Sequence, residues 1–431
     1  MTVLRKSRAA LGVGLAVALL ATGCGGSDAE DDGRITLNVG LFGTFGFEEA
    51  GLYDEYMELN PDIRIEETSV ERSADYYRTL QTRLAANSGL ADVQGIEIGF
   101  VADLTENHAD AFVDFAALDG ADETLGHFYD WKVEPATSED GRVIGLGTDA
   151  GPEGMCYRRD LFEQAGLPTD RDELSALWAD WDGYLELGRR YAAAPGRAEG
   201  TSFVDSPASI FSAAVYQGEF AYADEDGQPI PDTSDGVQAA WEDASAAAEE
   251  GLTAGLTQFG DEWNSAFANG GFATVACPAW MLGYITSQAG DDASGQWDVA
   301  TLPGGSTNWG GSWLGVPESA EHREEAIARV QWLTAPEQQI KMFTREAHFP
   351  SSRVAAEDPE VSGATNEYFN GAPVGQIFGQ AAAELRFTPI SRYDTQIQEA
   401  FSSALTNVAT QDTSPDDAFD EAMTEIEDIV G

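Results

Sequence analysis

Positive charge is scarce in this sequence. Its 431 residues include 23 Lys and Arg against 75 Asp and Glu, which gives a formal net charge of -52 at pH 7. Only Lys6, Lys132 and Lys341 are lysines. Such acidity repels phosphate backbones and anionic lipid, which excludes nucleic-acid binding through a basic face. With 43% hydrophobic and 10% aromatic residues, the chain can still build sizeable cores, and its length predicts two domains.

The motifs of common enzyme classes are also missing. From residue 24 onward, the sequence contains no G-x-S-x-G elbow, no Walker A loop, no H-E-x-x-H and no G-x-G-x-x-G. Four histidines are scattered without the spacing of metal ligands. Pairs of carboxylates are frequent, but 75 acidic residues make such pairs inevitable, so they are no evidence for a glycosidase. We expect no catalytic residues, no metal site and no cofactor.

Long apolar runs are absent except at the N-terminus. The basic start Arg5-Lys6-Arg8 precedes an apolar stretch from Ala9 to Ala21, which is too short for a membrane-spanning helix. This pattern predicts a secretory signal at residues 1–23. Cys24 after Ala21-Thr22-Gly23 resembles the lipid-modified Cys of bacterial lipoproteins, although Leu is more usual than Ala at position 21. The alternative is ordinary secretion with a chance Cys. If the lipoprotein interpretation holds, Cys24 carries the lipid, and we expect the rest of residues 24–33 to be a flexible acidic tether.

Cysteine is rare, with only Cys156 and Cys277 left after Cys24. Outside the cell membrane an even pair is compatible with a disulfide, while two buried free thiols are the alternative.

Strands and helices alternate along the body of the sequence. Residues 35–41 alternate apolar and polar side chains as a strand does, and residues 52–59 repeat apolar side chains at helical spacing. The alternation of predicted strands and helices continues along the chain, which predicts an α/β fold with a largely parallel sheet. One helix is expected through residues 174–185, with Trp178 and Trp181 in the core. The Gly- and Pro-containing stretch at residues 145–154 predicts a passage between two domains.

Several aromatic residues lie where the pattern breaks. Trp280 follows the end of an expected strand. Trp309 and Trp313 lie on either side of the Gly pair at residues 310–311, and Phe42 and Phe45 lie in the loop expected after the first strand. Ligands of open α/β sheets bind at the carboxyl ends of strands, and an aromatic ring there can stack on a sugar. Core packing is the alternative for each ring.

Three segments identify a family. These are GMCYRRDLFEQAGLP (154–168), FANGGFATVACPAW (267–280) and TLPGGSTNWGGSWLGVPESA (301–320). Together with Cys24, they resemble the family 1 extracellular solute-binding proteins, the maltose-binding-protein-like sugar-binding lipoproteins of bacterial ABC importers, which are frequent in actinobacteria. The resemblance covers residues 34–431.

The resemblance implies a two-lobed α/β fold of the type II periplasmic-binding-protein kind, with a ligand cleft between the lobes. Three hinge crossings fall near residues 147–150, 303–306 and 349–353. Lobe 1 comprises residues 34–148 and 304–350, and lobe 2 comprises residues 149–303 and 351–431.

The resemblance also implies where ligand binds. Trp280 matches the family's stacking aromatic, and the other implied contacts are Gly43, Thr44, Phe45, Glu97, Asp149, Asp205, Arg392 and Tyr393. The first loop lacks a charged residue that some relatives use there.

The expected function is capture of a di- or oligosaccharide at the outer face of the cytoplasmic membrane. A monomer, held by its lipid anchor alone, would deliver this sugar to the transmembrane subunits of an ABC importer. One alternative is a binding protein for another solute, such as a polyamine, and the other is a secreted glycoside hydrolase.

Overall fold

The computed structural model describes residues 33–411 and 413–431. The predicted signal, Cys24 and all of the tether except Gly33 lie outside these described residues. Ile35–Gly431 form one compact unit, and this unit contains two β-sheets. No helix of the described residues is long and apolar enough to cross a membrane.

The first sheet has the strand order β2-β1-β3-β9-β4. Its strands are β1 (Ile35–Phe42), β2 (Ile63–Val70), β3 (Val93–Glu97), β4 (Leu146–Gly147) and β9 (Ser312–Gly315). β1 pairs in parallel with β2 and β3, whereas β9 runs antiparallel to both β3 and β4. The prediction of a parallel sheet is therefore right for the first three strands only. β9, which enters the first sheet after the last strand of the second sheet, lies between β3 and β4 and runs against both.

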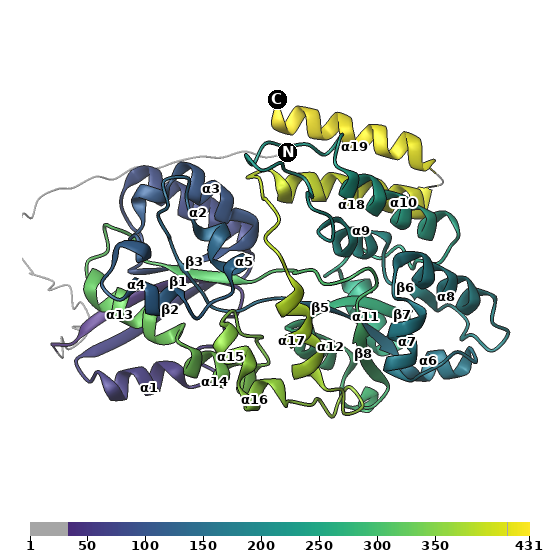
Figure 1. Cartoon of the computed structure of the whole chain (residues 1–431), viewed down its shortest axis with the longest axis horizontal. Coiled ribbons are helices and arrows are strands. Elements are labelled where there is room, and N and C mark those ends of the chain that lie inside the picture. The colour runs from purple at the N-terminus through teal and green to yellow at the C-terminus, as the bar shows by residue number, and fades with distance from the viewer. Residues whose placement is uncertain (1–32, 412) are drawn as a thin grey trace, which may run out of the picture. The chain divides into compact units, whose positions relative to one another are not determined.

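Helices cover both faces of the first sheet (Figure 1). One face carries Leu37, Val39 and Leu41, which share a core with the helices α1, α13 and α14. The other face carries Ile96 and Trp313, which pack on α2 and α3. The helices of this region are α1 (Leu52–Leu59), α2 (Ser73–Ala86), α3 (Ile98–Asn107), α4 (Ala121–Leu125), α5 (Asp130–Val133), α13 (Arg323–Leu333) and α14 (Pro336–Glu346).

The second sheet has the order β6-β7-β5-β8 and is mostly antiparallel. Its strands are β5 (Glu153–Arg158), β6 (Ser202–Val204), β7 (Phe272–Pro278) and β8 (Trp297–Thr301). Their residues are almost all buried, because helices cover both faces of this sheet as well.

The two faces of the second sheet belong to separate cores. Met155 and Tyr157 point into the core formed with α6 to α10, α18 and α19, while Cys156 and Val275 point toward α11, α12 and α17. These helices are α6 (Arg159–Gln164), α7 (Arg171–Leu177), α8 (Trp181–Ala193), α9 (Pro207–Val215), α10 (Asp235–Glu249), α11 (Asp261–Asn269), α12 (Met281–Ala289), α15 (Arg353–Glu357), α16 (Pro359–Ser362), α17 (Val374–Glu384), α18 (Asp394–Gln411) and α19 (Pro415–Val430).

The single helix expected through residues 174–185 is in fact two helices. α7 ends at Leu177 and α8 begins at Trp181, after Asp180 caps it by accepting a hydrogen bond from the Gly183 N–H at 2.8 Å. Asp180 favours the start of a new helix here, because its carboxylate satisfies a free N–H of the first turn of α8. Trp178 and Trp181 are 0% and 7% exposed, so the prediction that they lie in the core is confirmed.

Three segments run between the two sheets and are bonded to one another. The first joins β4 to β5, the second joins β8 to β9, and the third follows α14. The Ala150 N–H donates to the Phe349 carbonyl at 2.8 Å, and the Trp309 N–H donates to the Gly151 carbonyl at 2.8 Å. These bonds hold all three segments side by side at the place where the chain leaves each sheet.

Candidate functional site

The loop after β1 lines a small cavity. The cavity has a volume of about 100 Å³ and is bounded by Phe42, Gly43, Thr44 and Phe45 together with Asp149 and Ser312. The Phe42 and Phe45 rings meet edge to face with centroids 5.1 Å apart, and Phe45 is buried while Thr44 is exposed. The structure thus brings the predicted first-loop residues together with Asp149 of the first crossing.

Asp149 lines this cavity and is hydrogen-bonded to the first residue of β9. One oxygen of its carboxylate accepts hydrogen bonds from the Ser312 N–H at 2.9 Å and from the Thr148 hydroxyl at 2.8 Å. The side chain is only partly buried, so it combines a fixed position with access from the cavity.

Two further charged groups lie near Asp149 at the ends of β3 and α5. Glu97 caps α3, accepting a hydrogen bond from the Gly99 N–H at 2.8 Å. Burial raises the pKa of Glu97 to about 7, although this hydrogen bond and the Lys132 cation lower it. Burial likewise lowers the pKa of Lys132 to about 8, against the attraction of Asp149 and Glu97. A carboxyl and an amine that both titrate near neutrality make this part of the site sensitive to pH.

Lys132 covers a face of Trp313. Its ammonium lies 3.6 Å from the ring centroid, and the Trp313 indole N–H donates to the Lys132 carbonyl at 2.9 Å. Trp313 is 1% exposed and lies in the core between β9 and the helices α2 and α3. Its ring therefore has no free face in this structure, and the core-packing alternative describes it better than the predicted ligand contact.

Trp280 and Trp309 form an aromatic corner beside the crossings. Both are partly exposed, their ring centroids are 5.6 Å apart at 73°, and the Trp280 indole N–H donates to the Trp309 carbonyl at 3.0 Å. A Cβ added to Gly151 would lie 1.9 Å from the Trp309 carbonyl oxygen, so glycine is required where the first crossing passes this corner.

Asp205 occupies a different environment from the one predicted. Its side chain is 0% exposed, and its carboxylate accepts a hydrogen bond from the Trp263 indole N–H at 2.8 Å. Burial raises the pKa of Asp205 to about 6, against this bond. Asp205 is thus bonded inside the protein rather than presented to a ligand.

Arg392 and Tyr393 lie between α17 and α18. The Arg392 guanidinium bonds Glu106 of α3 at 3.0 Å and the Tyr393 hydroxyl at 2.7 Å. Nearby, the Thr395 hydroxyl donates to the Gly99 carbonyl at 3.3 Å. These contacts connect the segment before α18 to the helix that Glu97 caps.

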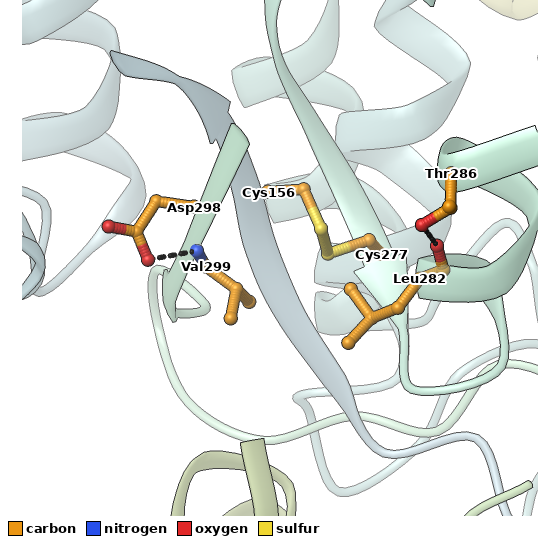
Figure 2. Close-up of a disulfide and its surroundings, with 6 residues drawn as sticks. All are labelled: Cys156, Cys277, Leu282, Thr286, Asp298 and Val299. Carbon is orange, nitrogen blue, oxygen red and sulfur yellow. Dashed lines mark hydrogen bonds between the residues drawn. A yellow bond between two sulfur atoms is a disulfide. The ribbon is translucent and has the colours of Figure 1, made fainter. Parts of the chain in front are cut away.

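The two cysteines form the disulfide Cys156–Cys277, which links the neighbouring strands β5 and β7 (Figure 2). Their Cα atoms are 5.8 Å apart, and both residues are 0% exposed. β7 ends at Pro278, two residues before Trp280, so the disulfide anchors the strand that leads to this ring. The prediction of a disulfide is confirmed.

A family model described as a bacterial extracellular solute-binding protein matches residues 51–368. The chain belongs to this family. It is 28% identical over 337 residues to a lactose-binding protein of Rhizobium radiobacter, an alignment that covers 75% of this chain and 76% of that protein. It is 22% identical over 383 residues to an arabinooligosaccharide-binding protein of Halalkalibacterium halodurans, covering 85% and 83% of the two chains.

Solved structures of solute-binding proteins share the fold. One, described as an extracellular solute-binding protein family 1, is 39% identical with a TM-score of 0.84 and covers 92% of this chain and 100% of its own. Another, the ABC transporter associated binding protein of B. animalis subsp. lactis in complex with β-1,6-galactobiose, is 18% identical with a TM-score of 0.74 and covers 92% and 98%. The predicted fold class, α/β with two lobes and three crossings, is confirmed.

Two residues that sequence reasoning missed now stand out in this solute-binding protein. Lys132 could have been noticed because it is one of three lysines and follows Trp131 directly. Phe259 is the other, an aromatic residue between Gln258 and Gly260 just before α11. Among the described residues, no cluster of three or more His, Cys, Asp or Glu could hold a metal ion.

Proposed function

We propose that this solute-binding protein captures a di- or oligosaccharide for an ABC importer. The observation that carries the proposal is the aromatic corner of Trp280 and Trp309, placed beside the crossings with partly exposed carboxylates in the same region. Aromatic faces stack on the apolar face of a sugar ring, and carboxylates accept hydrogen bonds from its hydroxyls. The named ligands of the relatives, lactose, arabinooligosaccharide and β-1,6-galactobiose, support this class of solute.

The mechanism we propose is capture by closure of the two lobes. We assign lobe 1 to residues 34–148 and 304–350, and lobe 2 to residues 149–303 and 351–431, in agreement with the sheet to which each strand belongs. A sugar that touches both lobes favours the closed state, because only that state makes both sets of contacts. Closure also removes water from the sugar hydroxyls, so an analogue that lacks one leaves a buried polar group unpaired.

The contacts we propose from lobe 1 are the first loop, Phe42, Gly43, Thr44 and Phe45, together with Glu97. Asp149 joins them from the first crossing. From lobe 2 we propose Trp280, with Trp309 of the second crossing beside it, and Arg392 and Tyr393 at the outer end of the site. A polyamine is less well supported, because the Lys132 ammonium already lies close to the two carboxylates that would attract one.

The test is a binding panel measured by thermal shift and then by calorimetry. The probes are galactose, glucose, lactose, β-1,6-galactobiose, maltose, maltotriose, cellobiose, xylobiose and an arabinooligosaccharide, with spermidine as the cationic probe. We expect at least one oligosaccharide to raise the unfolding temperature and to bind with a measurable heat. A response to spermidine alone would overturn the carbohydrate assignment.

We further propose that the protein acts without chemistry on its ligand. Chromatography after prolonged incubation should recover the oligosaccharide intact. Release of shorter sugars at a rate that depends on the protein concentration would establish a glycoside hydrolase instead.

Lipid anchoring through Cys24 completes the proposal. Cells that express the full chain should hold the protein in the detergent-rich phase of a detergent partition. A Cys24→Ser variant should move to the aqueous phase and should elute from a sizing column as a monomer.

A further inference from the structure

The loop between α10 and α11 displays an aromatic side chain at an energetic cost. Phe259 is 49% exposed, and its backbone has a φ of 62°, in the left-handed region that side chains other than those of Gly, Asn and Asp rarely adopt. A large residue in this conformation costs on the order of 1–3 kcal/mol and persists only where its surroundings enforce it. Neither the exposure nor the conformation is explained by packing of the core.

The Phe259 ring extends the aromatic corner. It lies nearly parallel to Trp280, at 18° with centroids 6.5 Å apart, and meets Trp309 edge to face at 6.0 Å. Trp263 and Tyr284 support it from behind, with centroids at 5.1 and 5.8 Å. At 6.5 Å the Phe259 and Trp280 rings are too far apart to lie in direct face-to-face contact, so each keeps an aromatic surface of its own beside the other.

Asp205 holds this loop in place. Its buried carboxylate accepts hydrogen bonds from the Gln258 amide, just before Phe259, at 3.4 Å and from the Trp263 indole N–H, four residues after it, at 2.8 Å. Its backbone carbonyl accepts a hydrogen bond from the Leu256 N–H at 3.2 Å. Three bonds to one buried residue provide the surroundings that the left-handed backbone requires, and they give Asp205 a positioning role in place of ligand contact.

We propose that Phe259 is a specificity-determining residue that stacks on a second sugar ring of the ligand, beside the ring on Trp280. The inference rests on the proposed function and adds to it the residue that distinguishes a ligand of two or more sugar rings from a monosaccharide. Asp205 acts only through the loop, by keeping Phe259 between the buried Trp263 ring and Trp280.

The test compares single-ring and multiple-ring probes on matched variants. Phe259→Asn removes the ring but keeps a residue that tolerates positive φ, and Phe259→Tyr keeps the aromatic face. Leu59→Ala is the control, since Leu59 is an exposed apolar residue at the end of α1, outside the aromatic corner. Calorimetry uses galactose and glucose as single rings, and lactose, β-1,6-galactobiose, maltose, maltotriose, cellobiose and xylobiose as longer probes.

We expect Phe259→Asn to weaken binding of the oligosaccharides by about tenfold and to leave any monosaccharide affinity within about twofold. Phe259→Tyr and Leu59→Ala should bind as the wild type does. Thermal unfolding without ligand separates this effect from a loss of folding, and we expect the unfolding temperature of Phe259→Asn to stay within a few degrees.

The outcomes distinguish the inference from the function on which it rests. If the wild type binds an oligosaccharide and Phe259→Asn binds it equally well, the role of Phe259 is refuted while carbohydrate binding stands. An equal loss of affinity for single rings and oligosaccharides would also overturn the second-ring contact. If no saccharide binds the wild type, the proposed function and the role of Phe259 fall together.

Discussion

Glu153 is a buried carboxyl group whose pKa is raised by burial alone. It begins β5, is 3% exposed, and burial alone raises its pKa from 4.5 to about 8. Between these two values the folded protein holds a proton that the unfolded chain has released. The free energy of unfolding therefore falls as the pH rises through this window.

We expect Glu153→Gln to remove this dependence. At pH 4, below both pKa values, the variant and the wild type should be equally stable, and at pH 9 the variant should be more stable by about 2–4 kcal/mol. Urea unfolding followed by Trp fluorescence at both pH values measures the difference. Glu58→Gln, at an exposed position of α1, is the control. A gain of the same size at pH 4 and pH 9 would show that ionisation of Glu153 is not the cause.

A second prediction at this scale concerns Trp280. Trp280→Ala removes one side of the aromatic corner, and because stacking is worth about 1 kcal/mol beyond burial we expect sugar affinity to fall by tenfold or more. Trp280→Phe should recover part of this loss, since it restores an aromatic face without the bond to the Trp309 carbonyl. Calorimetry with the tightest-binding sugar of the panel measures both, and unchanged affinity in Trp280→Ala would remove this ring from the site.

The sequence allowed some of these residues to be found but not others. Trp280 could be placed near the crossings because it follows a strand directly. Trp313 also lies beside a break in the pattern, two residues after the Gly310-Gly311 pair, yet the alternation of β9 turns its side chain into the core. Phe259 and Lys132 could not be found from spacing, because a left-handed backbone and a buried ammonium depend on contacts between segments distant in sequence.

At the scale of elements, the disulfide joins two strands that the chain separates widely. Cys156 and Cys277 are 121 residues apart in sequence, and a crosslink closing so long a loop lowers the entropy of the unfolded chain substantially. We expect the double variant Cys156→Ala/Cys277→Ala to lose about 4–5 kcal/mol of the free energy of unfolding. Urea unfolding measures the loss.

Titration of thiols tests the same bond chemically. In a denatured, unreduced Cys24→Ser protein we expect no reactive thiol, and two thiols only after reduction. Two reactive thiols before reduction would contradict the disulfide. Any stability loss of the double Cys156→Ala/Cys277→Ala variant would then have to come from altered packing alone.

Elements were predicted more reliably than their pairing. Apolar periodicity correctly placed β1 and α1, because the apolar side chains of each recur at the spacing of its own buried face. The break between α7 and α8 was missed, although Asp180 carries the capping signal. The antiparallel insertion of β9 could not be read from local pattern, since nothing within Ser312–Gly315 specifies which strand it joins.

At the scale of the molecule, the net charge of -52 should affect thermal stability through repulsion between acidic side chains. Like charges on one body repel, and salt screens this repulsion with a Debye length of about 10 Å at 0.1 M. We expect the unfolding temperature at pH 8 to rise by roughly 3–6 °C between 20 and 500 mM NaCl. Tetramethylammonium chloride should act equally if screening is the cause. A temperature independent of both salts would mean that the acidic residues are too dispersed to matter.

The place of β9 also bears on how the chain folds. β9 begins at Ser312, after all strands of the second sheet, and yet it pairs between β3 and β4. Until it arrives, β3 presents an open edge, and open edges recruit strands from other chains. Pairings between segments so distant in sequence form slowly, because the chain loses the entropy of closing a long loop before the new contacts stabilise it. The emerging chain therefore passes through a stage in which the strands of the second sheet are complete and the first is prone to aggregation.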